Sequence, residues 1–103
     1  MNRVFKALAD PTRRQVLQLL RSGPKNAGEL SERFPVSKPT MSAHFAVLRE
    51  ADLVEVERSG KQLIYHLKIS VLEDALIGFA DSFGLGHAPA GPAPVLKKKV
   101  VTP

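Results

Sequence analysis

The sequence predicts a mainly α fold with a small β-hairpin, in the element order of a winged helix-turn-helix. Two observations predict it: apolar residues recur at helical spacing through the first half, and the turn dipeptide Ser59-Gly60 separates two short alternating segments. The chain has 103 residues, 44% of them hydrophobic, which suits one small soluble domain. We expect residues 1–84 to form that domain.

The first two helices are predicted from their apolar spacing and from the residues at their ends. The first is short and amphipathic, on the spacing of its apolar residues Val4, Phe5 and Leu8. Asp10 offers an N-cap and Pro11 suits the first helical position, so a second helix begins there. Gly23-Pro24 ends it.

A third and a fourth helix follow, joined by a turn. The third is expected over residues 27–34, and Pro35-Val36 make the turn. Ser37 caps the fourth helix, in which the apolar residues recur at i, i+4 and i+7: Met41, Phe45 and Leu48. The rest of that helix is small and polar, so one face packs and the other is smooth enough to enter a groove.

A hairpin and a last helix complete the domain. Residues 53–57 and 63–67 are expected to be strands joined at Ser59-Gly60, although the first alternates less cleanly than the second. A final helix over about 70–83 has an apolar stripe that must be covered, formed by Leu72, Leu76, Phe79 and Phe83.

Residues 85–103 change in composition and are expected to form a flexible tail. They hold four prolines and the adjacent lysines Lys97, Lys98 and Lys99. The lysines either are simply solvated or add nonspecific attraction to phosphates.

Charge and cysteine content narrow the classes of function. Lys and Arg exceed Asp and Glu by five in residues 1–51, whereas residues 52–84 carry a net −3 and residues 85–103 a net +3. This distribution favours contact with a polyanion and is also compatible with a soluble surface or membrane association. The absence of cysteine excludes disulfides, zinc-thiolate clusters and thiol redox switching. No apolar run approaches the ~20 residues that span a bilayer, so we expect a cytoplasmic protein without membrane contact.

Three segments together resemble the ArsR/SmtB family of dimeric winged-helix repressors, and within it a cysteine-free branch of autorepressors. They are DPTRRQVLQLL, ELSERFPVSKPTMSAHFAVLREADLV and ERSGKQLIYHL, and the resemblance covers roughly residues 2–84. It implies a sequence-specific DNA-binding regulator, most simply a repressor of its own operon. Its fourth helix would lie in the major groove of double-stranded DNA.

The resemblance, projected onto a helix at 100° per residue, assigns DNA contacts to the fourth helix. The residues assigned there are Ser37, Lys38, Pro39, Thr40, Ser42, Ala43 and His44. Lys38, Thr40 and Ser42 can reach base edges or phosphates, while Ala43 and Ala46, which also project outward, offer only apolar contact. No Arg, Asn or Gln projects from this side, so DNA shape and half-site spacing should contribute to specificity. His44 flanks the core, which suggests packing or a phosphate contact.

Further contacts are expected from the hairpin turn and the second helix. The turn residues Arg58, Lys61 and Gln62 would hold phosphates or enter the minor groove. Arg13 and Arg14 lie in the first turn of a helix, where a cation is unfavourable. Either a carboxylate such as Asp10 or Glu50 or a DNA phosphate would offset them, with Arg14 slightly favoured for DNA. His66 is expected to be half-buried beside Tyr65, without a function.

The resemblance also implies a homodimer that binds an inverted repeat with half-sites about one helical turn, ~10 base pairs, apart. The apolar residues available for its interface are Val4, Phe5, Leu8, Leu72, Leu76, Phe79 and Phe83. Some of them must instead close the core of the single chain.

Effector sensing departs from the family pattern. Relatives bind metal through cysteines on the third helix or through His and carboxylates on the last. Here the third helix has neither Cys nor His, and Glu73, Asp74 and Asp81 of the last helix could be joined only by His87 beyond it. We expect no metal and no cofactor, and a protein partner could instead release the repressor. A winged-helix protein-interaction module and a nonspecific nucleic-acid binder remain alternatives, whereas no set of catalytic residues indicates an enzyme.

Overall fold

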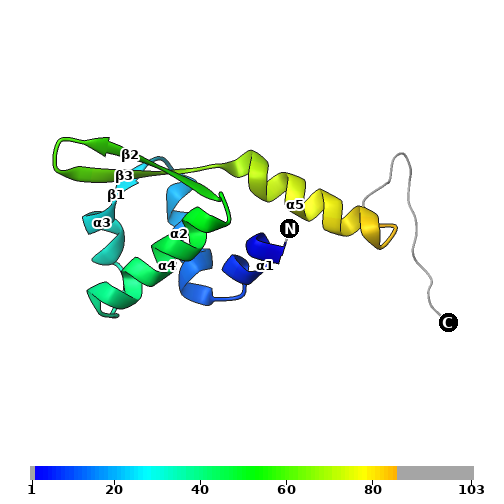
Figure 1. The fold of residues 1–103 in the computed structure, drawn as a ribbon, viewed down its shortest axis with the longest axis horizontal. Coiled ribbons are helices and arrows are strands. Elements are labelled where there is room, and N and C mark those ends of the chain that lie inside the picture. Colours follow the sequence, from blue (N-terminus) through cyan, green and yellow to red (C-terminus); the bar gives the residue numbers. More distant parts are fainter. Residues whose placement is uncertain (1, 86–103) are drawn as a thin grey trace. The chain divides into compact units, whose positions relative to one another are not determined.

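The computed structural model describes residues 2–85 and confirms the predicted fold class (Figure 1). The elements are α1 (Asn2–Leu8), α2 (Pro11–Leu20), β1 (Lys25–Asn26), α3 (Ala27–Ser31), α4 (Lys38–Glu50), β2 (Val54–Ser59), β3 (Gln62–Leu67) and α5 (Ile69–Ser82). The chain divides into two units, one ending at Leu72 and the other starting at Glu73, so the second holds most of α5. Apart from Leu85, the tail expected over 85–103 lies outside the described residues, as does His87.

Asp10 begins α2 as an N-cap, as predicted. Its carboxylate oxygen Oδ2 accepts hydrogen bonds from the backbone N–H groups of Thr12 at 2.8 Å and Arg13 at 3.2 Å. Partial burial works to raise the pKa of Asp10, but these two N–H donors, together with the charges of His44 and Arg13, hold the pKa below its ordinary value. Pro11 occupies the first helical position, where its missing N–H costs nothing.

The helix α3 is shorter than expected because it ends at Ser31 instead of residue 34. Its start is firm: Asn26 and Glu29 form a capping box, each side chain accepting from the other residue's backbone N–H, at 2.8 and 2.9 Å. Near its end, Phe34 precedes Pro35, whose ring disfavours the helical conformation in the residue before it. The segment after Ser31 continues as turns, in which the N–H groups of Arg33 and Phe34 bond carbonyls three residues earlier.

The helix α4 ends in a Schellman motif that turns the chain into β2. Leu53 N–H bonds the carbonyl of Leu48 at 3.1 Å and Asp52 N–H bonds that of Arg49 at 2.9 Å. Asp52 takes the left-handed conformation, φ 61°, that this motif needs. These local bonds fix the direction in which the hairpin leaves α4.

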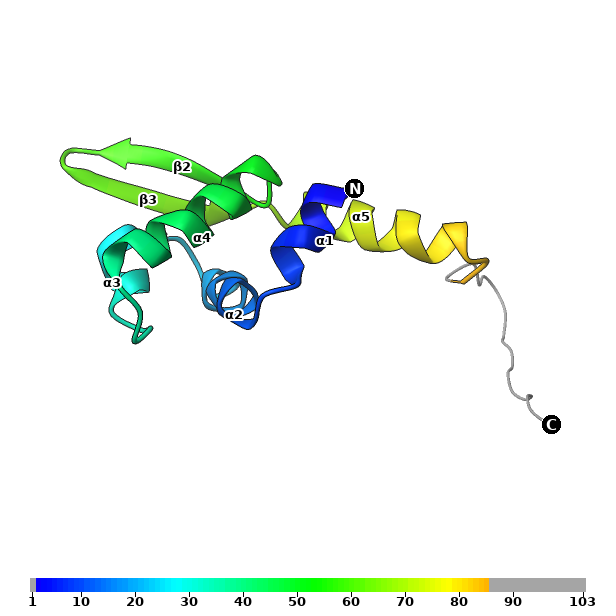
Figure 2. The same cartoon turned by 60° about the horizontal axis from the view of Figure 1, so that its bottom comes forward.

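The sheet has three antiparallel strands in the order β1-β3-β2, whereas the sequence predicted a two-stranded hairpin. Ser59 pairs with Gln62, so Gly60 (φ 63°) and Lys61 form a two-residue turn. The added strand β1 has only two residues, with Lys25 opposite Tyr65 and Asn26 opposite Ile64. Figure 2 shows the hairpin extending beside α3 and α4.

The core holds α4 by the three residues that the helical spacing predicted. Met41, Phe45 and Leu48 are buried, and they are surrounded by residues from several elements, among them Val16, Leu30, Leu53 and Tyr65. The rings of Phe45 and Tyr65 pack with centroids 4.7 Å apart, which ties α4 to β3. One face of α4 is therefore fixed inward and its rotation about its own axis is set.

Candidate nucleic-acid interface

The side of α4 that points away from the core is open to solvent through its first half. The five exposed residues there are Lys38, Pro39, Thr40, Ser42 and Ala43, and each was assigned to DNA from the sequence. We call this set the α4 outer face. It is narrow, mostly small and unobstructed within the described residues, which are the properties a helix needs to enter a major groove.

A pair of hydroxyl groups at the start of α4 is oriented by hydrogen bonds. Ser37 Oγ accepts from the backbone N–H of Thr40 at 3.3 Å and donates to Thr40 Oγ1 at 2.9 Å. The hydroxyl of Ser37 is thus used inside the protein, as a cap. Because Thr40 Oγ1 accepts that proton, its own hydroxyl proton is directed elsewhere and is available to a base or a phosphate.

The hairpin turn places three polar residues in solvent: Arg58, Lys61 and Gln62. Arg58 is opposite Leu63 in the register, so its side chain lies on the same face of the sheet as Val56 and Tyr65, the face toward α4. Glu57 lies on the other face, where its Oε1 is 2.8 Å from Nε2 of His66. The strand alternation therefore turns the cation of Arg58 toward α4 and the carboxylate of Glu57 away from it.

A hollow of about 610 Å³ opens between α3, α4 and β3, beside the contact of Phe45 with Tyr65. Lys38, Ser42 and Arg49 line its α4 side, and Leu63 and Tyr65 line its β3 side. Arg49 was not nominated from the sequence, although it follows Ser42 by seven residues and therefore lies on the same face of the helix. It adds a cation between the α4 outer face and the hairpin.

Arg13 and Arg14 lie in the first turn of α2, yet their side chains donate hydrogen bonds to the carbonyls at the end of α1. Arg13 Nε donates to the carbonyl of Ala7 at 2.8 Å and Nη2 to that of Lys6 at 2.9 Å, while Arg14 Nη1 donates to that of Leu8 at 2.7 Å. Cations at the C-terminal end of α1 are favourable to its dipole, which offsets their cost at the start of α2. The partners are thus carbonyls of α1, and neither Asp10 nor Glu50 supplies an ion pair to these arginines in the structure.

His44 lies on the flank of α4 that faces α2. Its Nδ1 is 3.1 Å from Nη1 of Arg13 and 3.9 Å from the carboxylate of Asp10. Its side chain is 15% exposed, so it is neither fully in the core nor on the α4 outer face. This agrees with the expected position beside the core.

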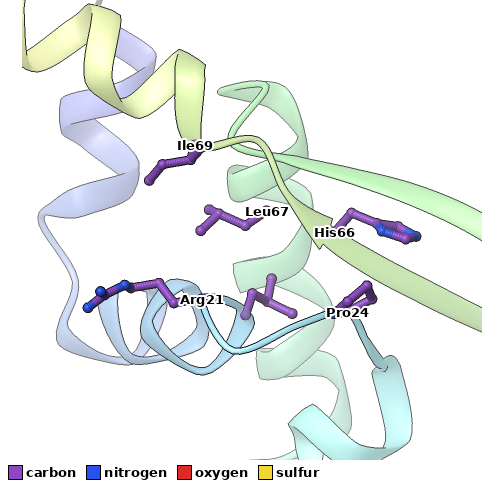
Figure 3. A pocket seen from close by; sticks show the side chains of 6 residues that line it. Arg21, Pro24, His66, Leu67 and Ile69 are labelled. Carbon is purple, nitrogen blue, oxygen red and sulfur yellow. The ribbon is translucent and has the colours of Figure 1, made fainter.

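A second hollow, of about 370 Å³, lies between the end of α2 and β3 (Figure 3). Its polar side chains, Arg21 and His66, point to opposite sides, so they do not converge on one ligand. Among residues 2–85, no group of three or more His, Cys, Asp or Glu side chains could hold a metal ion. No helix in that range has the length and hydropathy that crossing a membrane requires.

An exposed helix held by its apolar face beside a β-hairpin with a basic turn defines a winged helix-turn-helix protein. A model described as a helix-turn-helix domain matches residues 8–57. The transcriptional repressor SdpR of Bacillus subtilis strain 168 is 43% identical over 76 residues, which cover 74% of this chain and 84% of that protein. The arsenical resistance operon repressor of Staphylococcus xylosus is 34% identical over 73 residues, 71% of this chain and 70% of that one.

Solved structures agree with these sequence matches. A crystal structure of an ArsR family transcriptional regulator superposes with a TM-score of 0.75 at 27% identity, over 85% of this chain and 97% of that one. The chain therefore belongs to the ArsR/SmtB family of winged-helix transcriptional repressors. That family consists of regulators of transcription and not of enzymes.

Proposed function

We propose that this chain is a dimeric repressor that places α4 in the major groove of an inverted-repeat operator. The observation that carries the proposal is the orientation of α4. Burial of Met41, Phe45 and Leu48 turns the α4 outer face to solvent, on the same helix that packs against a hairpin whose turn is basic. We expect the dimer to act in the cytoplasm, on double-stranded DNA.

Contacts to DNA divide among three regions. Lys38, Thr40 and Ser42 offer the polar groups that can contact base edges, while Pro39 and Ala43 offer apolar contact such as with a thymine methyl. Arg58, Lys61 and Gln62 hold phosphates or enter the adjacent minor groove. Arg49 joins the two sets, and Arg14, whose guanidinium is exposed, supplies a weaker phosphate contact.

Specificity is shared with DNA shape. The five residues of the α4 outer face include no Arg, Asn or Gln to make a bidentate contact with a base, and Arg49 lies further along the helix in the hollow beside β3. A dimer that requires two half-sites at fixed spacing, on DNA that deforms easily, gains discrimination at positions that it does not touch. We therefore expect an operator defined by spacing and groove geometry as much as by individual bases.

Dimerisation is supported by the exposed apolar residues of α5. Leu76 is 47% exposed, Phe79 44% and Phe83 65%, and the tilted rings of Phe79 and Phe83 pack with centroids 5.0 Å apart, so these side chains offer neighbouring apolar surface. Ile77 is also 59% exposed, but it lies about 100° round the helix from Leu76 and therefore off the predicted stripe, in which Leu72 is half-buried. Of the residues expected from α1, Phe5 and Leu8 are half-buried, while Val4 is only 6% exposed in the single chain and adds little.

Repression of its own operon is the simplest regulatory role, in keeping with the likeness to a relative named a transcriptional repressor. Release would come from a protein partner or from a fall in concentration below the dimer or operator dissociation constant. A promoter assay tests autorepression: a reporter fused to the DNA upstream of this gene should fall when the wild-type chain is expressed. It should fall less with a Ser42→Ala, Lys61→Ala double variant. A reporter insensitive to the wild-type chain would refute autorepression.

A further inference from the structure

We propose that Arg13 is a positioning residue that fixes His44 as a neutral imidazole whose Nε2–H donates to a DNA backbone phosphate. The inference rests on the proposed DNA-binding function and deepens it. It adds a phosphate contact on the α2 side of α4, the flank opposite the hairpin. DNA would then be held on both sides of the recognition helix.

The bond between Arg13 and His44 determines where the imidazole carries its proton. A guanidinium remains charged and has donors only, so at 3.1 Å Nη1 of Arg13 must donate and Nδ1 of His44 must accept. An accepting Nδ1 has no proton, which places the proton of the ring on Nε2. The carboxylate of Asp10 is 3.9 Å from Nδ1, too far to compete as a hydrogen-bond partner.

Arg13 is itself held rigidly, so the direction of its bond to His44 is fixed. Its Nε and Nη2 donate to the carbonyls of Ala7 and Lys6 at the end of α1, at 2.8 and 2.9 Å. Three nitrogens of one planar fork are thus engaged by three acceptors on two elements. A lysine ammonium on a flexible stem could not reproduce this geometry.

The other ring nitrogen of His44 remains available. Among the described residues the contacts of this ring are made through Nδ1, and no buried side-chain nitrogen or oxygen there lacks a hydrogen-bond partner. A ring nitrogen without a protein partner must therefore be open to solvent. Nε2–H is a donor that is partly shielded, fixed in direction and accessible from outside.

The surroundings favour a phosphate as its acceptor. Residues 2–14 carry four cations, Arg3, Lys6, Arg13 and Arg14, against Asp10 as their one carboxylate. Thr40 precedes His44 by one helical turn and directs its free hydroxyl proton away from Ser37. A DNA strand that passes the cations of residues 2–14 would meet two oriented donors on α4, the hydroxyl of Thr40 and Nε2–H of His44.

Imidazole ¹⁵N spectra of the full chain test the first half of the proposal without DNA. The spectrum of His44, assigned by its loss in His44→Gln, should show the Nε2–H form in the wild type. Arg13→Lys should convert it to a mixture of tautomers. Arg14→Lys is the matched control, since Arg14 also bonds an α1 carbonyl but does not contact His44, and it should change nothing. An Nδ1–H ring in the wild type would overturn the proposal.

Operator affinity in a double-mutant cycle tests the second half of the proposal, that Arg13 strengthens DNA binding through the phosphate contact of His44. Arg13→Lys should weaken binding about tenfold in the wild-type background and less than twofold when His44→Gln is already present. Arg21→Lys, at the other end of α2 and outside the proposed interface, should change affinity in neither background, with unchanged melting temperatures as the control for folding. Equal losses from Arg13→Lys in both backgrounds would overturn the positioning role. A wild-type chain that shows the Nε2–H form but selects no DNA site would overturn the proposed function and the phosphate contact together.

Discussion

Asp52 and Lys68 join the end of α4 to the end of the hairpin: Oδ1 of Asp52 lies 2.8 Å from Nζ of Lys68. The hydrogen bond to this carboxylate raises the pKa of Lys68. Nearby, the backbone N–H of Lys68 bonds the carbonyl of Leu53 at 2.9 Å. The residue in the left-handed conformation that redirects the chain after α4 is thus also tied to the strand that returns from the turn, so the recognition helix and the hairpin keep a fixed relation.

The left-handed conformation of Asp52 predicts an order of stability among substitutions. Asp52→Ala should lower the free energy of unfolding by about 1 kcal/mol, because a Cβ-bearing residue without a helpful polar group is strained at φ 61°. Asp52→Gly relieves that strain and loses only an exposed ion pair, which contributes little. In urea unfolding, Asp52→Gly should therefore have a higher free energy of unfolding than Asp52→Ala. The reverse order would contradict the role given to the backbone.

The N-cap at Asp10 predicts how acid affects stability. Because the folded-state pKa of Asp10 is lowered, its stabilising contribution is present above the ordinary Asp value of about 3.9 and is lost as the pH falls through the folded-state pKa. Asp10→Asn keeps a cap but has no carboxylate to protonate. The unfolding free-energy difference between wild type and Asp10→Asn should therefore narrow below about pH 4. Asp74→Asn, on α5, is the control, and a difference that widens on acidification would be inconsistent with the cap.

Ser42 should distinguish specific from nonspecific DNA. Ser42→Ala removes one hydroxyl from the α4 outer face, so it should weaken the cognate operator by about 1 kcal/mol or more and leave random DNA nearly unchanged. Competition titrations with both DNAs measure the two losses. Ser22→Ala, at an exposed serine in the turn after α2, should change neither. If Ser42→Ala weakened binding to cognate and random DNA equally, its hydroxyl would have no role in reading the bases.

Lys61 should contribute to binding through charge alone. Lys61→Gln removes a cation from the hairpin turn, so it should weaken every DNA sequence alike and lower the slope of log affinity against log salt by about 1. The measurement is a salt titration of affinity for operator and random DNA. Lys25→Gln serves as the control, because the ammonium of Lys25 is 3.2 Å from Ser22 Oγ and stands outside the proposed interface. An unchanged slope in Lys61→Gln would exclude a phosphate contact.

The exposed apolar residues of α5 predict the oligomeric state. The wild-type chain should sediment as a dimer at micromolar concentration, and the combined change Leu76→Glu, Phe79→Glu should leave monomers, because charged side chains cannot be buried unpaired in an apolar interface. Val36→Glu changes an exposed apolar residue in the turn before α4 and should leave the dimer intact. A wild-type chain found only as monomers would reject the dimer and, with it, the inverted-repeat operator.

Local signals explain why most of the fold could be predicted from the sequence. Asp10, Ser37 and Gly60 act on backbone within three residues of themselves, so the starts of α2 and α4 and the hairpin turn are visible in the sequence. The strand β1 was missed because two residues carry no periodicity and because their partners on β3 lie 38 and 40 positions away in the sequence. The exposure of the α4 outer face followed from helical spacing alone.

Long-range contacts explain what was missed in the candidate interface. The partners of Arg13 are carbonyls on α1 and a ring on α4 that lies 31 positions away, and no sequence pattern marks a carbonyl as a partner. The sequence suggested a carboxylate or a phosphate because only side-chain charges can be listed in advance. Arg49, in contrast, follows Ser42 by seven residues, so its place on the same face of α4 could have been predicted from helical spacing.

Selection of genomic fragments by the wild-type chain, in excess competitor DNA, tests the central claim most directly. We predict selective enrichment of fragments that contain an inverted repeat, with footprints over two half-sites about one helical turn, ~10 base pairs, apart. Ser42→Ala should reduce that enrichment. Recovery of fragments without any preferred site would indicate a nonspecific nucleic-acid binder, and failure to retain DNA would indicate a protein-interaction module. Either result would contradict the assignment of the α4 outer face to operator recognition.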